Sequence, residues 1–200
     1  MLPRVAALLL ALGVGVVANA AAGKARAQAA RSTAAPLPEG SLFRLDVRLE
    51  PAGGGERQLR SLAGHPTVIA MFYSSCTSVC PMLVLEMQRI ESALGSAERD
   101  RVQFAMVSLD AERDQATALE AFAAEHHLDR ARWLLAHASA RDVRTLAAAL
   151  GVRYRQLPDK SFSHSSVITL LDAEGVARDR TSVPSTDQAE FLQRVRDLLR

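Results

Sequence analysis

Cysteine is scarce in this chain: its 200 residues contain two, and both lie in the stretch FYSSCTSVCP, at Cys76 and Cys80. A disulfide between them would close a very short loop and remove little conformational entropy from the unfolded chain, so it would stabilise the fold only weakly. A plain structural disulfide is therefore the less favoured interpretation. The clustering indicates instead a site at which two sulfur atoms act together.

The chain also lacks a marked excess of charge of one sign. Its formal net charge is +2, but setting aside Arg4, Lys24 and Arg26, whose segment holds no acid, leaves 21 of 24 basic residues against 22 acidic ones. The remainder of the chain is thus near −1. Such a balance gives no electrostatic reason to expect nucleic acid or a membrane surface as a partner. Contact with a membrane is expected only through the start of the chain.

The longest apolar run stands at that start, at residues 5–22, interrupted only by Asn19. An arginine precedes it and small residues with two Ala-x-Ala sites follow it, which is typical of a secretory signal peptide. The run also approaches the roughly 18–20 residues that span a bilayer, so an uncleaved anchor is the alternative. The absence of a cysteine near residue 20 argues against a lipoprotein. We interpret residues 1–27 as a signal peptide or an N-terminal membrane anchor, and expect the folded part to be extracytoplasmic, in the periplasm.

Residues 28–40 are rich in alanine and proline and show no periodicity, as expected for a tether. Residues 41–200 have the length of one ordinary domain with a single core, and they contain no internal repeat or second linker. In this domain strand-like and helix-like segments alternate, which predicts an α/β fold with a mixed sheet between helices. The expected strands are 42–51, 67–73, 101–110 and 132–138, with a hairpin at 166–180, and the expected helices are 82–94, 114–128, 138–151 and 188–199.

The two cysteines follow the apolar strand and open the first of these helices. Pro81 falls in its first turn, where the missing N–H costs little. Residues four apart lie on one side of a helical turn. The unpaired N–H groups and the positive end of the helix dipole favour thiolate over thiol there. The pattern therefore predicts two reactive sulfur atoms, Cys76 and Cys80, presented to solvent.

A third ligand would complete a metal site, and His164 is the best candidate among the five histidines. It stands just before the apolar strand VITLL. A loop that enters an antiparallel neighbour of the central strand arrives at the end of the sheet where the cysteines lie. The alternative interpretation of His164 is an ordinary loop histidine that binds no metal. The other four histidines, for which solvated or packed roles are expected, are His65, His126, His127 and His137.

Two thiolates and one imidazole form a soft, low-coordinate set that suits Cu(I), and a water or another fourth group could complete a Cu(II) site. Zinc also accepts two cysteines, one histidine and a water. The residue types alone do not separate copper from zinc.

Cys-x-x-x-Cys-Pro, the later VSLDAERD and the His-Ser pair before an apolar strand together resemble the SCO/SenC family of thioredoxin-like copper proteins, from about residue 41 to residue 200. The resemblance implies a thioredoxin-like fold, with a central mixed sheet flanked by helices and an additional N-terminal β-hairpin. It also implies that Cys76, Cys80 and His164 bind one copper ion, as Cu(I), Cu(II) or both. Asp110 matches an acidic position near the family's metal site.

The chain departs from the family pattern around these ligands. Thr77 and Ser78 follow the first cysteine in place of proline and aspartate, Ala111 replaces a proline, and Ser163 stands where an aspartate often precedes the histidine. The last difference matters most, because outer carboxylates orient ligating imidazoles. Because all three ligand positions are kept, we expect this difference to affect the affinity for the metal ion and its rate of exchange.

The resemblance implies a metallochaperone that helps assemble the copper site of a respiratory cytochrome oxidase. The implied partners are a copper-accepting oxidase subunit or another copper carrier, and a thiol reductant. We expect no enzymatic activity. The alternatives are a thiol–disulfide oxidoreductase that uses Cys76 and Cys80, and a redox or copper sensor that uses the same site. A peroxidase is the weakest reading, since Pro81 directly after Cys80 and a lone distant histidine are not its pattern.

Overall fold

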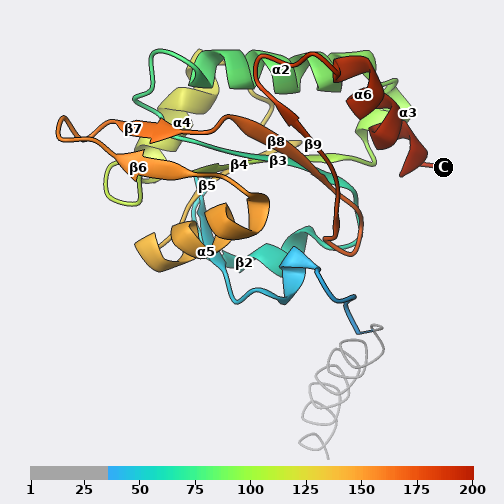
Figure 1. Ribbon diagram of the computed structural model, residues 1–200, viewed down its shortest axis with the longest axis horizontal. Coiled ribbons are helices and arrows are strands. Elements are labelled where there is room, and N and C mark those ends of the chain that lie inside the picture. Colours follow the sequence, from blue (N-terminus) through green and yellow to red (C-terminus); the bar gives the residue numbers. More distant parts are fainter. Residues whose placement is uncertain (1–35) are drawn as a thin grey trace, which may run out of the picture. The chain divides into compact units, whose positions relative to one another are not determined.

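The computed structural model describes residues 36–200, and a mixed sheet lies between helices in this part of the chain (Figure 1). The strands are β1 Arg48–Pro51, β2 Arg57–Gln58, β3 Thr67–Phe72, β4 Gln103–Ser108, β5 Trp133–His137, β6 Tyr154–Gln156, β7 Phe162–His164, β8 Val167–Leu171 and β9 Ala177–Ser182. The helices are α2 Cys80–Ala93, α3 Ser96–Arg99, α4 Ala116–Glu125, α5 Ala140–Leu150 and α6 Gln188–Asp197, with short 3-10 helices η1 Leu42–Arg44 and η2 Leu59–Leu62. The predicted leader, residues 1–27, and most of the predicted tether, residues 28–40, lie outside the described residues.

The main sheet has seven strands in the order β2-β1-β5-β4-β3-β8-β9. Its centre is parallel, because β3 pairs with β4 and β4 with β5 in the same direction. The outer strands β1 and β8 run antiparallel to β5 and β3. The predicted α/β fold with a mixed sheet is thereby confirmed, and β1 with β2 forms the expected N-terminal hairpin.

Two apolar layers cover the faces of this sheet, which explains why β3 is an unbroken apolar run. Every residue of β3 is buried. Val68, Ala70 and Phe72 face the cluster that contains α2, α4 and α6, whereas Ile69 and Met71 face the cluster that contains α5 and the 3-10 helices. A fully buried phenylalanine such as Phe72 contributes about 1.5–3 kcal/mol through burial. The end of β3, from which the cysteine loop departs, is thus anchored on both faces of the sheet.

The hairpin of β6 and β7 was not predicted. It forms a separate two-stranded sheet in which Tyr154 pairs with His164, and its tip is a tight turn at residues 157–161. Each strand has three residues, and most of them are polar or partly exposed, so no apolar alternation marks them in the sequence. The prediction that His164 lies in a loop was therefore wrong, because His164 is the last residue of β7.

The strand expected at residues 42–51 is shorter in the structure. Residues 42–44 form the 3-10 helix η1, capped by the Ser41 side chain, and strand pairing starts only at Arg48.

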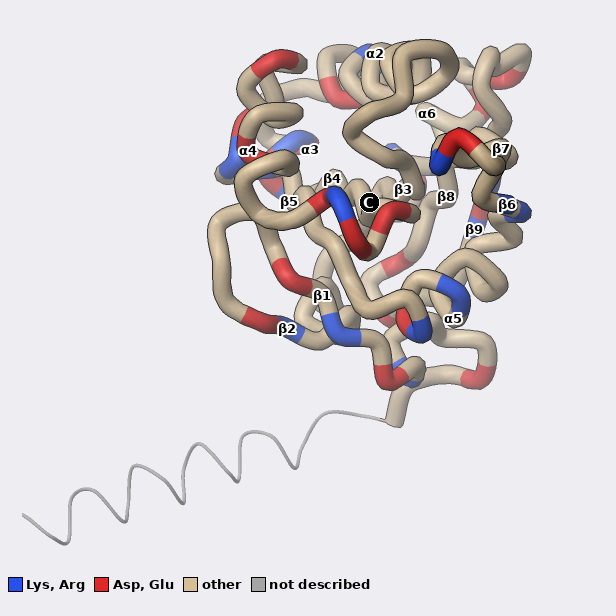
Figure 2. The backbone as a smooth tube through the Cα atoms, turned by 90° about the vertical axis from the view of Figure 1, so that its left-hand side faces the viewer, with Lys and Arg blue, Asp and Glu red and all other residues tan. Residues whose placement is uncertain are grey.

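Acidic and basic residues are interspersed around the domain in the view of Figure 2, as the near-neutral composition indicates. Within residues 36–200, none of the helices combines the length and the apolar character that crossing a bilayer requires.

Candidate metal centre

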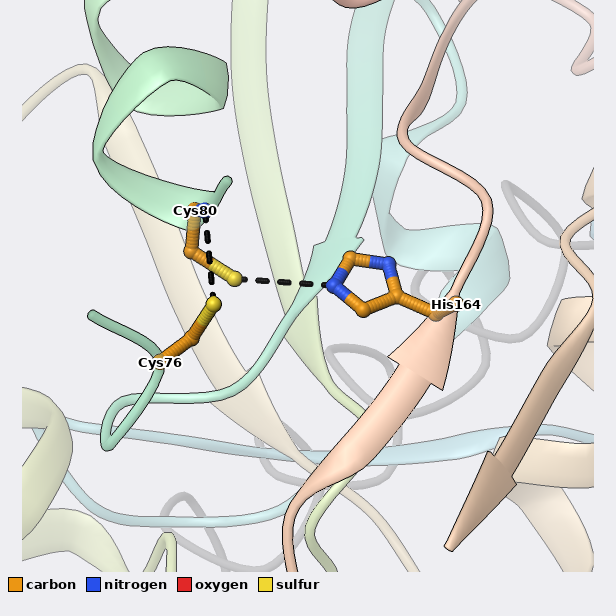
Figure 3. A group of neighbouring side chains, drawn as sticks. All are labelled: Cys76, Cys80 and His164. Atoms are coloured by element: carbon orange, nitrogen blue, oxygen red, sulfur yellow. Dashed lines mark hydrogen bonds between the residues drawn. The ribbon is translucent and has the colours of Figure 1, made fainter. Parts of the chain in front are cut away.

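Three segments bring the predicted ligands together at one end of the central strands (Figure 3). Cys76 lies in the loop that follows β3, Cys80 is the first residue of α2, and His164 ends β7. The two sulfur atoms and a ring nitrogen of His164 all lie within 4.8 Å of one another. Among residues 36–200 this is the one cluster of three or more histidine, cysteine or acidic side chains close enough to hold a metal ion.

The cysteine loop folds back so that its first sulfur atom caps the helix. The backbone N–H of Cys76 donates to the carbonyl of Tyr73 at 3.2 Å, which tightens the turn after β3. The N–H of Cys80 donates to Cys76 Sγ at 3.4 Å. Val79, the N-cap residue, makes no side-chain cap. Cys76 therefore satisfies one of the free N–H groups at the start of α2, which holds its sulfur atom at that end of the helix.

Both sulfur atoms are buried, so the prediction that they face solvent was wrong. Cys76 is 6% exposed and Cys80 is fully covered. The reason is that the first turn of α2 packs onto the sheet, where Cys80 joins the same apolar cluster as Phe72 and Leu83. The two sulfur atoms do lie close together, but the fold of the loop brings them together and not helical spacing, because α2 begins only at Cys80 and Cys76 lies in the loop before it.

The two thiols differ in acidity. Burial opposes ionisation of Cys76, but hydrogen bonds from the Cys80 thiol, the N–H groups of Ser78 and Cys80 and the Ser78 hydroxyl outweigh it and lower its pKa to about 7. Burial raises the pKa of Cys80 far above its usual value, and its hydrogen bond with Cys76 and the negative charge of Asp114 add to the rise. The helix start therefore favours one thiolate, that of Cys76, and the expectation of two was wrong for Cys80.

His164 is oriented by the backbone and not by a carboxylate. Its Nδ1 atom lies 3.2 Å from the carbonyl oxygen of Ser165, which can only accept, so Nδ1 carries the proton. Burial lowers the pKa of His164 below its usual value, which leaves the ring neutral at pH 7. Its other nitrogen, Nε2, then presents a lone pair toward Cys80 Sγ at 3.6 Å. The Ser165 carbonyl thus supplies the orientation that the missing aspartate at Ser163 would give.

Asp110, the predicted outer acid, forms no hydrogen bond with any of the three ligands and is not part of their cluster. It is buried and accepts from Arg113 through both the backbone N–H and the guanidinium. The sequence reasoning missed Asp114, four residues on, which accepts from the Ser74 N–H at 2.7 Å and from the Ser74 and Ser108 hydroxyls. The signal was present, because an acid beside two serine-bearing strand ends indicates a buried hydrogen-bonded network.

Tyr73 was also missed, although it touches both ligand-bearing segments. Its hydroxyl donates to the carbonyl of Phe162 at 3.3 Å, and its ring meets that of His164 edge-on with centroids 5.8 Å apart. The remaining histidines lie outside the cluster. For example, His137 is buried at the end of β5, with Nε2 3.8 Å from a Glu50 carboxylate oxygen.

A thioredoxin-like sheet that carries a Cys-x-x-x-Cys pair at its central strand, together with a distant histidine, defines a class of metal-binding thiol proteins. The SCO1/SenC family model matches residues 40–200, and the chain therefore belongs to this family. The resemblance inferred from the sequence and the thioredoxin-like fold are both confirmed.

Several relatives extend this comparison. A protein of Stutzerimonas stutzeri to which copper binding has been ascribed is 24% identical over 139 residues, which cover 68% of this chain and 66% of that protein. The structure of Bradyrhizobium japonicum ScoI with copper bound is similar, with a TM-score of 0.63 and 22% identity over 74% of this chain and 96% of that one. BsSco, a Sco-family cytochrome c oxidase assembly protein with a disulfide switch, has a TM-score of 0.65 and 21% identity over 76% of this chain and 84% of its own.

Proposed function

We propose that this protein is an extracytoplasmic copper carrier that binds one copper ion through Cys76, Cys80 and His164. We propose further that it helps to assemble the copper site of a respiratory cytochrome oxidase. The observation that carries the proposal is the convergence of two sulfur atoms and one unprotonated imidazole nitrogen within 4.8 Å. Family membership and the copper-bound relative support copper over zinc, which the ligand set would also accept.

The ligand set accommodates both copper valences. Two thiolates satisfy Cu(I), whereas Cu(II) gains from a nitrogen donor and a fourth group such as water. Binding costs the release of the Cys80 proton, because burial keeps that thiol protonated in the metal-free protein. Cys76, whose pKa is lowered to about 7, is already about half ionised at neutral pH. It is also the less deeply buried sulfur, so ligand exchange with a recipient would begin there.

A thiol–disulfide oxidoreductase is the second candidate, and the difference in acidity between the two thiols favours it. The Cys76 thiolate would attack a substrate disulfide, form a mixed disulfide and release one substrate thiolate. Cys80 would then lose its proton and attack the Cys76 sulfur, which closes the Cys76–Cys80 disulfide and releases the second substrate thiol. The substrate is reduced by two electrons and the protein is oxidised, so a thiol reductant must restore it. The disulfide switch of BsSco supports this reading.

The location and the partners are part of the proposal. Extracytoplasmic location is supported by the signal-like pattern of residues 1–27, and the partners would be a copper-accepting oxidase subunit or another copper carrier. A copper or redox sensor would use the same three residues. The decisive first test is an anaerobic titration of the reduced protein with Cu(I) and with Zn(II), with metal counted per chain. Failure to bind copper would overturn the proposal, and a preference for zinc would replace its metal.

A further inference from the structure

One short segment touches both parts of the chain that carry the candidate ligands. This segment, residues 110–114, follows β4 and leads to α4, and it is visible in Figure 2 as the run of red and blue just below the labels β4 and β3. The cysteines follow β3 and His164 ends β7, so the segment lies between two pieces of chain with no covalent connection nearby. A buried acid, Asp114, makes the contact with the cysteine loop, and Arg113, held by the buried acid Asp110, makes the contact with the hairpin.

The first contact holds the cysteine loop. Asp114 is 1% exposed, and its carboxylate accepts from the N–H and the hydroxyl of Ser74, two residues before Cys76. The same carboxylate accepts from the hydroxyl of Ser108, the last residue of β4, at 2.5 Å. The loop is therefore tied to the end of the neighbouring strand through one buried group.

The second contact holds the hairpin of β6 and β7. The Arg113 guanidinium donates to the buried Asp110 carboxylate, and its Nη2 atom donates to the carbonyl of Lys160 at 2.5 Å. Lys160 lies in the tip of the hairpin with a φ of 64°, a left-handed conformation that fixes the direction of its carbonyl. The Arg113 side chain is 41% exposed, yet the buried acid holds its charged end in place.

This second contact matters because β6 and β7 pair only with each other and not with the seven-stranded sheet. Sheet hydrogen bonds therefore place β8, which begins three residues after His164, but they do not hold the hairpin strands to the main sheet. Within residues 36–200, apart from the contact of Cys80 Sγ with His164 Nε2 in the site itself, the side-chain hydrogen bonds that cross to the hairpin strands and their tip are those of Arg113 to Lys160 and of Tyr73 to Phe162. One lies at the tip and the other lies two residues before His164.

We propose that residues 110–114 act as a strut with two arms that sets the spacing of the metal site. In this strut Asp114 positions the cysteine loop, and Arg113, held by Asp110, positions His164. Asp110 thus acts on the site through Arg113 and the hairpin without touching a ligand. The inference rests on the proposed copper site, and it assigns a role to residues outside the three ligands.

The two arms predict separable effects. Loss of the Arg113 arm should allow the hairpin to shift and weaken the imidazole donor, which Cu(II) needs and Cu(I) can lack. Partners that orient ligands from outside typically change metal affinity about ten- to a hundredfold. The Asp114 arm stays intact in an Arg113 variant, so the thiol chemistry of Cys76 should change by no more than about twofold.

The test compares Arg113→Ala with Arg155→Ala in the reduced full-length protein. Arg155 lies on β6 of the same hairpin, and no side-chain hydrogen bond or ion pair of Arg155 is found within residues 36–200. We would measure Cu(II) affinity by competition with a chelator, the Cu(II) paramagnetic resonance spectrum, Cu(I) affinity and the rate of Cys76 alkylation. Lys160→Gly serves as a second control, because the acceptor is a backbone carbonyl and glycine tolerates the left-handed conformation.

The expected result is a Cu(II) affinity at least tenfold lower and an altered spectrum in Arg113→Ala, with little change in the two controls. Unchanged Cu(II) affinity and spectrum in Arg113→Ala, in the presence of a clear effect of His164→Ala, would overturn the strut and leave the copper site standing. No effect of either variant would instead overturn His164 as a ligand. If Arg113→Ala lowers the Cu(I) affinity as much as the Cu(II) affinity and also lowers thermal stability, then Arg113 has a merely structural role and the proposal is rejected.

Discussion

The Nε2 atom of His164 lies 3.6 Å from the Sγ atom of Cys80, although 84 residues separate them in the chain. With Nδ1 bonded to the Ser165 carbonyl, Nε2 directs a lone pair at Cys80 Sγ, whose single proton bonds to the Cys76 sulfur atom when Cys76 is ionised in the metal-free protein. A metal ion that displaces this proton would find its sulfur and nitrogen donors already facing each other. The proposed site is therefore organised before the metal arrives.

The first prediction concerns stoichiometry. Reduced protein should bind one copper ion per chain, and oxidation of Cys76 and Cys80 to a disulfide should abolish binding, because the thiolate is the ligand. Metal analysis after gel filtration of the reduced and oxidised protein measures both. Undiminished copper binding by Cys80→Ser would contradict the ligand assignment.

The second prediction concerns His164→Ala, which removes the nitrogen donor and keeps both sulfur atoms. Cu(I) binding should weaken modestly, whereas Cu(II) binding should fall much further, because Cu(II) needs the imidazole to complete its coordination. The Cu(II) absorption spectrum reports the change directly. A spectrum identical to that of the unmodified protein would show that His164 is not a ligand.

The third prediction concerns pH. Alkylation of Cys76 in the reduced, metal-free protein should reach half its maximal rate near pH 7 and fall about tenfold per pH unit below it, because the thiolate is the nucleophile. Cys80 should stay unreactive through the neutral range, since burial raises its pKa. Mass spectrometry of the alkylated peptides distinguishes the two sites. Half-maximal modification of Cys76 close to pH 9 would contradict its lowered pKa.

The lowered pKa of Cys76 also makes the free energy of unfolding depend on pH. The pKa of Cys76 is lower in the folded than in the unfolded protein, so its contribution to the free energy of unfolding is fully present above the ordinary value of 9.0. It decreases as the pH falls toward 7 and is lost below the folded value. Comparison with Cys76→Ala in urea unfolding at pH 6 and pH 9 isolates this contribution.

The sequence was most informative where the chemistry is local. The spacing of Cys76 and Cys80 and the following Pro81 predicted a strand-to-helix junction, and the apolar run before it predicted a central strand. Burial of the sulfur atoms was not predictable, because it depends on how α2 packs on the sheet. The His164 strand was missed since hairpin pairing, and not an apolar pattern, holds β6 and β7 together.

The roles of the outer acids show the same limit. The motif containing Asp110 and Asp114 was recognisable, but which acid lies beneath which ligand segment depends on the path of the loop after β4. In the structure Asp114 accepts hydrogen bonds from Ser74 of the cysteine loop, whereas Asp110 accepts from Arg113. Only contacts between segments far apart in the sequence reveal this division.

The fourth prediction concerns Asp114→Ala, which deletes the acceptor shared by Ser74 and Ser108. The buried Ser108 hydroxyl, the half-buried Ser74 hydroxyl and one N–H lose their partner, so the free energy of unfolding should fall by about 1–3 kcal/mol or more. Urea unfolding of the metal-free protein measures the loss. Asp100→Ala, at an exposed position, is the matched control and should stay within about 0.5 kcal/mol of the unmodified protein. Equal stability of the two variants would contradict the anchoring role of Asp114.

The last prediction separates the carrier from the oxidoreductase. A dithiol reductase needs Cys76 as the attacking thiolate and Cys80 as the resolving thiol, and its rate depends on their acidity and access. Of the two sulfur atoms His164 bonds only to that of Cys80, the resolving thiol, so His164→Ala should keep disulfide exchange with a model substrate within about tenfold. A copper carrier instead needs the imidazole to hold the ion until the recipient's ligands displace it. We therefore expect His164→Ala to lose most copper-dependent oxidase assembly in a deletion strain, as Cys76→Ser and Cys80→Ser should. Full complementation by His164→Ala, with failure of both cysteine variants, would assign the protein to thiol–disulfide exchange.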